Sequence, residues 1–267
     1  MKQELYKTRS AAACVKAGNK FFNANLSLMV RRLWLPALCV SVATGCCYVP
    51  YVRFVSPLLI LLAGVWMATQ VFAFFNEKDS RANLTKVLKL LLLSLLLNFA
   101  AGAIGGFVWG LFASVPSLAP YTLYALGAVA LLFMLVAVVF GLPYYFFVMK
   151  YIVEDISIKK SFWPSLKKGL RHWGMLFVLF LITGLILTFI ALIALMPLIV
   201  LSIAQSLSMQ GLMMGDAAGL PASFVWLMAA TIALTTLLLL LLEMWFVSVL
   251  YYAYGSIEQQ EAERKAK

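Results

Sequence analysis

The residue in this chain best suited to chemistry is a carboxylate at the end of an apolar run. Residues 235–246 read TTLLLLLLEMWF, so six consecutive leucines precede Glu243. An unpaired ionised carboxylate inside a bilayer is costly, and such residues often mark ion, proton or substrate pathways. We therefore expect Glu243 to be neutral or to be held by Asn98, Gln70 or a tyrosine hydroxyl.

Depth counting brings other polar residues close to the level of Glu243. If the sixth apolar segment enters the membrane interface around residues 251–254, Glu243 lies roughly 12–16 Å deeper. Asn98 falls at about 14 Å when counted from Lys89. Thr183 is at a similar level and Gln70 is somewhat shallower. These positions predict a buried polar layer of Glu243, Asn98, Gln70 and Thr183 that could line a binding site.

A second position for Glu243 stays open. Residues 224–242 are apolar enough to cross a bilayer alone, which would leave Glu243 at the headgroups. The following MWFVSVLYYAY would then stand outside the membrane, although it is too apolar and aromatic to remain unpacked in water. We favour the buried position, and within it we favour structural pairing over a proton relay.

A ridge of small and polar residues marks the third apolar segment. Its members recur every fourth residue: Ser94, Asn98, Gly102, Gly106 and Gly110. Overlapping GxxxG units allow another helix to approach closely, and Asn98 could hydrogen-bond across the contact. The ridge predicts a helix-packing seam, with a ligand-lining surface as the alternative.

Other chemistry-bearing residues do not form recognisable sites. His172 is the only histidine, and the four cysteines show no CxxC spacing. Neither a metal-ligand set nor a nucleophile with a base is evident. We expect no metal, no cofactor and no enzymatic activity.

Composition defines the elements that must position these residues. Of the 267 residues 64% are hydrophobic and only 12% are charged, so we expect an all-α, polytopic membrane protein. Hydropathy predicts six spans, at 33–52, 54–75, 87–114, 119–149, 174–205 and 222–253.

Basic residues predict the orientation of these spans. The net charge of +11 could suggest nucleic acid, but its distribution follows the connections between spans, so we expect no nucleic-acid partner. With both termini in the cytoplasm, only Arg53 of the 21 Lys and Arg residues lies outside. This bias predicts a multi-pass inner-membrane protein with cytoplasmic termini.

Residues 151–173 predict an amphipathic helix in the cytoplasmic interface. Apolar residues recur every fourth position from Ile158 to Leu170, and the other faces are basic. Pro164 could start a second helical piece. The residues expected to meet lipid headgroups, anionic ones in particular, are Lys159, Lys160, Lys167, Lys168 and Arg171.

Weaker interfacial segments at 8–31 and 78–89 suggest a repeat. Each unit would be an interfacial helix followed by a hairpin, with boundaries at 1–76, 77–150 and 151–256 and a charged cytoplasmic tail at 257–267. The simpler alternative is that basic connections only obey the orientation rule.

One stretch carries a family resemblance. An aromatic-rich span end, VEDISIKKSFWPSLKKG and then Trp173 resemble bacterial six-span proteins. These include the membrane domains found beside glycerophosphodiester phosphodiesterases. The resemblance covers mainly residues 140–190 and implies a bacterial integral membrane domain. Because the chain ends shortly after the sixth span, we expect no hydrolase domain and do not carry that activity over.

Two functional classes follow from these patterns. We expect a non-enzymatic inner-membrane protein that interacts with lipids, organises the membrane or supports a partner complex whose identity the sequence does not give. The alternative is a small transporter or permease subunit that uses a polar layer around Glu243 and Asn98. An intramembrane lipid-modifying enzyme is disfavoured, because His, Asp and Glu are scarce at any one level.

Overall fold

The protein is helical throughout the part that its structure describes. The computed structural model describes all residues except 1–4, 115–121, 155, 216–218 and 267, and the described residues contain no strand. The helices are α2 (Ala11–Cys46), α3 (Ser56–Asn76), α4 (Ser80–Ser114), α5 (Thr122–Val153), α6 (Ile158–Arg171), α7 (Trp173–Met213) and α8 (Phe224–Ala266). All except α6 contain a stretch long and apolar enough to cross a membrane. The predicted all-helical, multi-pass architecture is confirmed in these terms.

Several helices extend beyond the predicted spans. The interfacial segment expected at 8–31 is continuous with the first span, because α2 runs unbroken from Ala11 to Cys46. The Ser10 side chain accepts a hydrogen bond from the Ala13 N–H and caps its start. Segment 78–89 likewise belongs mostly to α4, and the charged tail continues α8 as far as Ala266. Only α6 is a separate short helix among the predicted interfacial segments.

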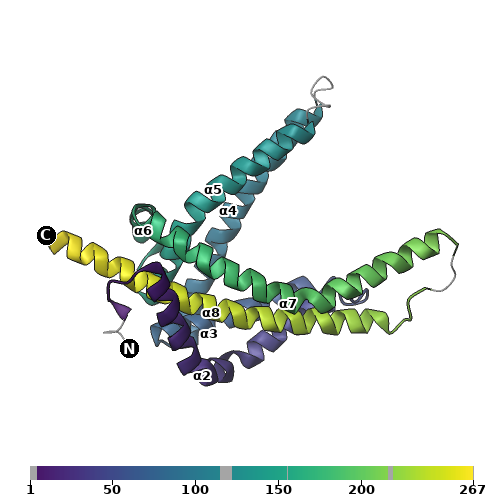
Figure 1. Cartoon of the computed structure of the whole chain (residues 1–267), viewed down its shortest axis with the longest axis horizontal. Coiled ribbons are helices and arrows are strands. Elements are labelled where there is room, and N and C mark those ends of the chain that lie inside the picture. Colours follow the sequence, from purple (N-terminus) through teal and green to yellow (C-terminus); the bar gives the residue numbers. More distant parts are fainter. Residues whose placement is uncertain (1–4, 115–121, 155, 216–218, 267) are drawn as a thin grey trace.

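The helices form a packed region from which hairpins diverge (Figure 1). We call this region the head; it comprises residues 5–21, 71–87, 142–173 and 244–263. Both described chain ends and α6 lie in it, while the α4–α5 and α7–α8 hairpins leave it in different directions. We call these hairpins the two arms. Residues far apart in sequence meet in the head, since α2 packs along α8.

Aromatic packing forms the core of the head. Phe21 of α2 stacks on Phe75 of α3 with ring centroids 6.2 Å apart, and Phe75 lies 5.1 Å from the Tyr251 ring of α8. Burying a large apolar side chain contributes about 1.5–3 kcal/mol, so this cluster is a main source of stability. A Cβ at Gly18 would lie 2.6 Å from the Val249 Cα, which shows how closely α2 approaches α8.

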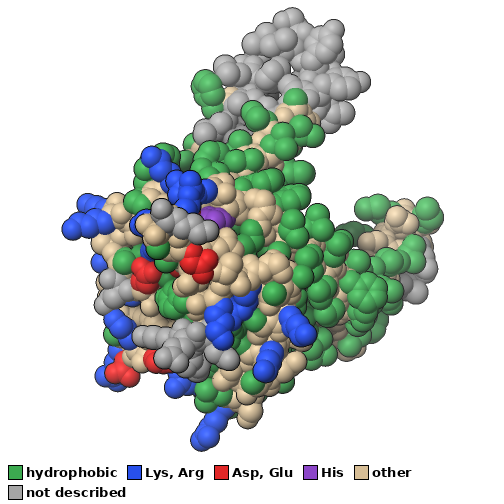
Figure 2. Space-filling model, turned by 60° about the vertical axis from the view of Figure 1, so that its left-hand side comes forward, with side chains coloured by type: hydrophobic (Ala, Val, Ile, Leu, Met, Phe, Trp, Pro, Cys, Tyr) green, Lys and Arg blue, Asp and Glu red, His purple; other side chains and the backbone are tan. Residues whose placement is uncertain are grey.

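The arms contrast with the head in what they expose. Large apolar side chains such as Leu95, Phe189 and Leu234 are exposed along them. Figure 2 shows hydrophobic side chains covering the arms and Lys and Arg side chains gathered over the head. This division suits helices whose outer surfaces meet hydrocarbon, because lipid does not penalise exposed apolar side chains.

Candidate functional sites

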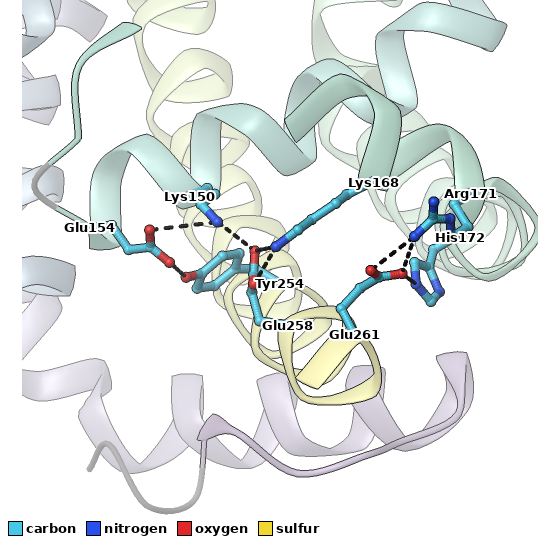
Figure 3. Close-up of polar contacts among 8 residues, drawn as sticks. All are labelled: Lys150, Glu154, Lys168, Arg171, His172, Tyr254, Glu258 and Glu261. Carbon is cyan, nitrogen blue, oxygen red and sulfur yellow. Dashed lines mark hydrogen bonds and ion pairs between the residues drawn. The ribbon is translucent and has the colours of Figure 1, made fainter. Parts of the chain in front are cut away.

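The end of α8 presents three polar side chains along one helix face. Tyr254, Glu258 and Glu261 follow the i, i+4, i+7 spacing that aligns side chains in a helix. They lie beyond the apolar run of α8 and point toward α5, α6 and the α6–α7 junction (Figure 3). The last turns of α8 therefore dock into the head through charged groups.

Glu258 is shared between two lysines. Its Oε1 lies 2.7 Å from Lys150 Nζ of α5, and its Oε2 lies 2.7 Å from Lys168 Nζ of α6. The Glu258 side chain is only 15% exposed. Burial opposes its charge, but the hydrogen bonds and charges of the two ammonium groups prevail and lower its pKa below the usual value. Glu258 thus connects α5, α6 and α8.

Glu261 makes a second set of contacts one turn later. Its Oε2 accepts a hydrogen bond from Arg171 Nη1 at 3.0 Å, and its Oε1 lies 3.0 Å from His172 Nε2. Although the Glu261 side chain is buried, the bonds to His172 and Arg171 and the charge of Arg171 lower its pKa. His172 thus contacts Glu261 at hydrogen-bond distance at the α6–α7 junction.

Tyr254 completes this network on the α5 side. Its hydroxyl donates to Glu154 Oε1 at 2.5 Å, and Glu154 Oε2 lies 3.6 Å from Lys150 Nζ. Glu258 and Glu261 are both paired with cations of the same chain, so neither carboxylate is free to act on a substrate. The network is suited to clamping helices together, because buried charges are tolerated only when paired and hydrogen-bonded.

Sequence reasoning missed this network, which we call the clamp. Its members are Lys150, Glu154, Lys168, Arg171, His172, Tyr254, Glu258 and Glu261 (Figure 3). The available signal was the one-face spacing of Tyr254, Glu258 and Glu261, although only the two glutamates fall in segment 257–267, which was treated as a tail. The partners of Glu258 and Glu261 lie 89 to 108 residues earlier in the sequence. No local sequence pattern specifies pairs at such a separation.

The predicted headgroup residues of α6 fall into two groups. Lys168 and Arg171 are engaged by Glu258 and Glu261, so their charges are largely compensated within the chain. Lys159, Lys160 and Lys167 are exposed and have no ion-pair partner among the described residues. α6 also continues through Pro164 as one helix, with no second piece.

Glu243 lines a cavity at the base of the arms. The cavity measures about 610 Å³ and is lined mainly by α3, α5, α7 and α8, including Gly64, Tyr145, Leu187 and Phe246. The Glu243 side chain is exposed to this space and has no hydrogen bond or ion pair with any described residue. Its carboxylate is thus available to a molecule in a cavity whose other polar side chain is Tyr145 among the described lining residues.

The predicted polar layer does not assemble around Glu243. Asn98 lies on α4, which does not contact α8 in the described part of the chain, and its amide donates to the Ser94 carbonyl at 2.8 Å. The buried Thr183 hydroxyl donates to the Leu179 carbonyl of its own helix. Gln70 is half-buried and does not line the Glu243 cavity. Depth counting places residues along the membrane normal but leaves their rotation about each helix undetermined.

The predicted packing ridge forms only at one end. The Ser94 hydroxyl lies 2.9 Å from the Tyr144 hydroxyl and links α4 to α5. At Gly102, Gly106 and Gly110, no described atom outside the helix lies within 4 Å of the place a Cβ would occupy. Among the described residues these glycines therefore make no close helix contact.

The described residues contain no group of three His, Cys, Asp or Glu side chains that could hold a metal ion. Comparisons of the chain with models of protein families, with curated proteins and with solved structures find no match in any of the three. The resemblance of residues 140–190 to six-span membrane domains accordingly stays a prediction.

Proposed function

We propose that this protein is a non-enzymatic, multi-pass inner-membrane protein of bacterial type whose head rests on the anionic cytoplasmic leaflet. The observation that carries the proposal is the uneven use of charge in the head. Glu258 and Glu261 of the head are paired with basic residues of the same chain, while Lys159, Lys160 and Lys167 are exposed. Cations at a membrane surface contribute about 1 kcal/mol each toward anionic lipid.

The orientation belongs to the same proposal. With the head in the cytoplasm, 20 of the 21 basic residues lie on the positive side. Helix α6 then lies where the two arms enter the bilayer. Because α6 contacts α5 of one arm and α7 of the other, lipid binding to α6 would affect the positions of both arms. This placement supports a role in organising the membrane or supporting a partner complex.

Neutralising the free face of α6 tests the lipid interaction. In the double variant Lys160→Gln/Lys167→Gln we expect the copurifying ratio of phosphatidylglycerol to phosphatidylcholine to fall severalfold at low salt. Screening should reduce the same ratio for the unmodified protein at high salt. Lys265→Gln, at the exposed end of α8, is the matched control. An unchanged ratio in the double variant would contradict the lipid role.

Reporter fusions test the orientation independently. Reporters inserted at 115–118 and at 206–220 should report the outside, and a reporter after residue 267 should report the cytoplasm. Reversed signals would overturn the placement of the head.

The Glu243 cavity favours a second candidate, a small permease subunit. A carboxylate without a partner inside an apolar cavity can bind a cation or a proton. In proteoliposomes containing a pH-sensitive dye, Glu243→Gln should abolish proton uptake driven by an imposed membrane potential. Asn98→Leu should do so only if Asn98 approaches Glu243 in another conformation. If both variants merely unfold at lower temperature, or wild type carries no flux, the permease candidate fails.

A further inference from the structure

A groove at the start of α6 combines cations with leucines. It measures about 620 Å³ and runs between α4 and the connection from α5 to α6. Its two kinds of lining residue are Lys86, Lys89 and Lys159, and Leu92, Leu93 and Leu96. None of these residues belongs to the clamp or lines the Glu243 cavity.

The sequence of α4 separates the two kinds of residue by depth. Lys86, Lys89, Leu93 and Leu96 follow the spacing of one helix face, and the leucines come later in the span. At about 1.5 Å per residue, Leu96 lies roughly 10 Å farther along α4 than Lys89. The groove is therefore cationic beside the head and apolar along the arm.

Contacts in the groove hold its charged end in position. Lys86 Nζ donates to the Glu154 carbonyl oxygen at 3.2 Å and lies 5.7 Å from the centre of the Tyr151 ring. Lys89 and Lys159 are exposed and make no ion pair within the described part of the chain. Ser157 also lines the groove, and its side chain makes no capping hydrogen bond to α6. The charged end thus presents the exposed ammonium groups of Lys89 and Lys159 together with the exposed Ser157 hydroxyl.

The apolar end is equally open. Leu92 and Leu96 are each 58% exposed. In a membrane-spanning arm these side chains meet hydrocarbon, so an acyl chain can continue along the groove without displacing protein atoms.

We propose that this groove is a specific site for one anionic phospholipid. The phosphate lies between Lys89 and Lys159, and an acyl chain follows Leu92 and Leu96. A soluble phosphate compound would occupy only the cationic end, and the positively charged headgroup of a zwitterionic lipid would face the ammonium groups of Lys89 and Lys159. The site rests on the proposed function only in requiring that the head lie at the membrane surface.

Native mass spectrometry of the full chain in mild detergent tests the site. Wild type should retain one phosphatidylglycerol at saturation and prefer it to phosphatidylcholine at least tenfold. In Lys89→Gln/Lys159→Gln the affinity should fall about 30-fold, because each interfacial cation contributes about fivefold. Lys86 is left unchanged, since its ammonium group donates a hydrogen bond to the Glu154 carbonyl oxygen just after α5. Glycerophosphoglycerol, which lacks acyl chains, should bind far more weakly than the intact lipid.

The matched control is Lys160→Gln/Lys167→Gln, which removes the same charge from α6 outside the groove. This control should keep the single bound lipid while losing the general enrichment of anionic lipid. Equal losses in the two double variants would overturn the groove but leave the head–leaflet proposal standing. Absence of any phosphatidylglycerol preference in wild type would overturn both. Equal binding of glycerophosphoglycerol and intact lipid would overturn the acyl part of the site.

Discussion

At the scale of single residues, Glu258 is the strongest test of the clamp. Glu258→Gln keeps the side chain's shape but removes the charge that Lys150 and Lys168 share. Because both cations would remain close together without the negative charge between them, and the new amide NH2 group would face one of them, we expect a loss of about 1–3 kcal/mol in the free energy of unfolding. The measurement is thermal unfolding in detergent micelles.

Glu263→Gln provides the residue-scale control. Glu263 lies one turn beyond Gln259 on the exposed end of α8 and accepts a hydrogen bond from Thr8. Exposed polar pairs contribute little, so this change should cost less than about 1 kcal/mol. Equal destabilisation by the two changes would show that Glu258 has no special role.

At the scale of helices, the contact between α5 and α6 depends on the absence of a side chain. A Cβ at Gly169 would lie 2.7 Å from the Pro143 Cα, and the backbone there cannot yield without moving the helices apart. Gly169→Val should therefore destabilise the protein by about 1–3 kcal/mol or more, as overpacking does. Thermal unfolding measures the loss.

Gly174→Ala is the matched helix-scale control. No described atom outside the local helix backbone lies within 4 Å of a Cβ built at Gly174, and this residue is also helical. Alanine favours the helix over glycine, so the change should be neutral or stabilising by up to about 1 kcal/mol. A larger loss at Gly174 than at Gly169 would contradict the close α5–α6 contact.

The glycines also show what sequence can predict about helices. Hydropathy located six helices that are long and apolar enough to cross a membrane, because apolar length alone decides that property. The GxxxG spacing marked Gly102, Gly106 and Gly110, yet the close contacts among the described residues occur at Gly18, Gly45, Gly169 and Gly255. Which helix face meets a neighbour depends on tertiary arrangement, and spacing within one helix does not determine it.

The same limit applies to polar residues. Glu243 was identified because a carboxylate in an apolar run is conspicuous, and it does line a cavity. Its predicted neighbour Asn98 is on a helix that leaves the head with the other arm (Figure 1). Glu258 and Glu261 were missed because charged residues near a terminus resemble a solvated tail until a partner surface is known.

At the scale of the whole molecule, the head joins segments that would otherwise diverge as separate hairpins. The N-terminal segment before α2 is bound to the end of α8, where the Arg9 N–H donates to Ser256 Oγ at 2.9 Å. Leu5 packs against Gly255 in the same region. The arms share few contacts beyond the head. Loss of the clamp should therefore make the positions of all hairpins relative to one another less fixed.

Acid should expose this dependence across the whole molecule. Glu258 and Glu261 have pKa values lowered in the folded protein, so their contribution to stability is present above the ordinary carboxyl value of 4.5. It is lost as pH falls below that value and the two carboxylates become protonated. We expect the thermal midpoint in detergent to fall steeply below about pH 4.5 in wild type. The double variant Glu258→Gln/Glu261→Gln should start from a lower midpoint and show a shallower acid decline, because its clamp is already uncharged. Parallel declines in the two proteins would place the acid sensitivity elsewhere and remove the clamp as the element that holds the hairpins together.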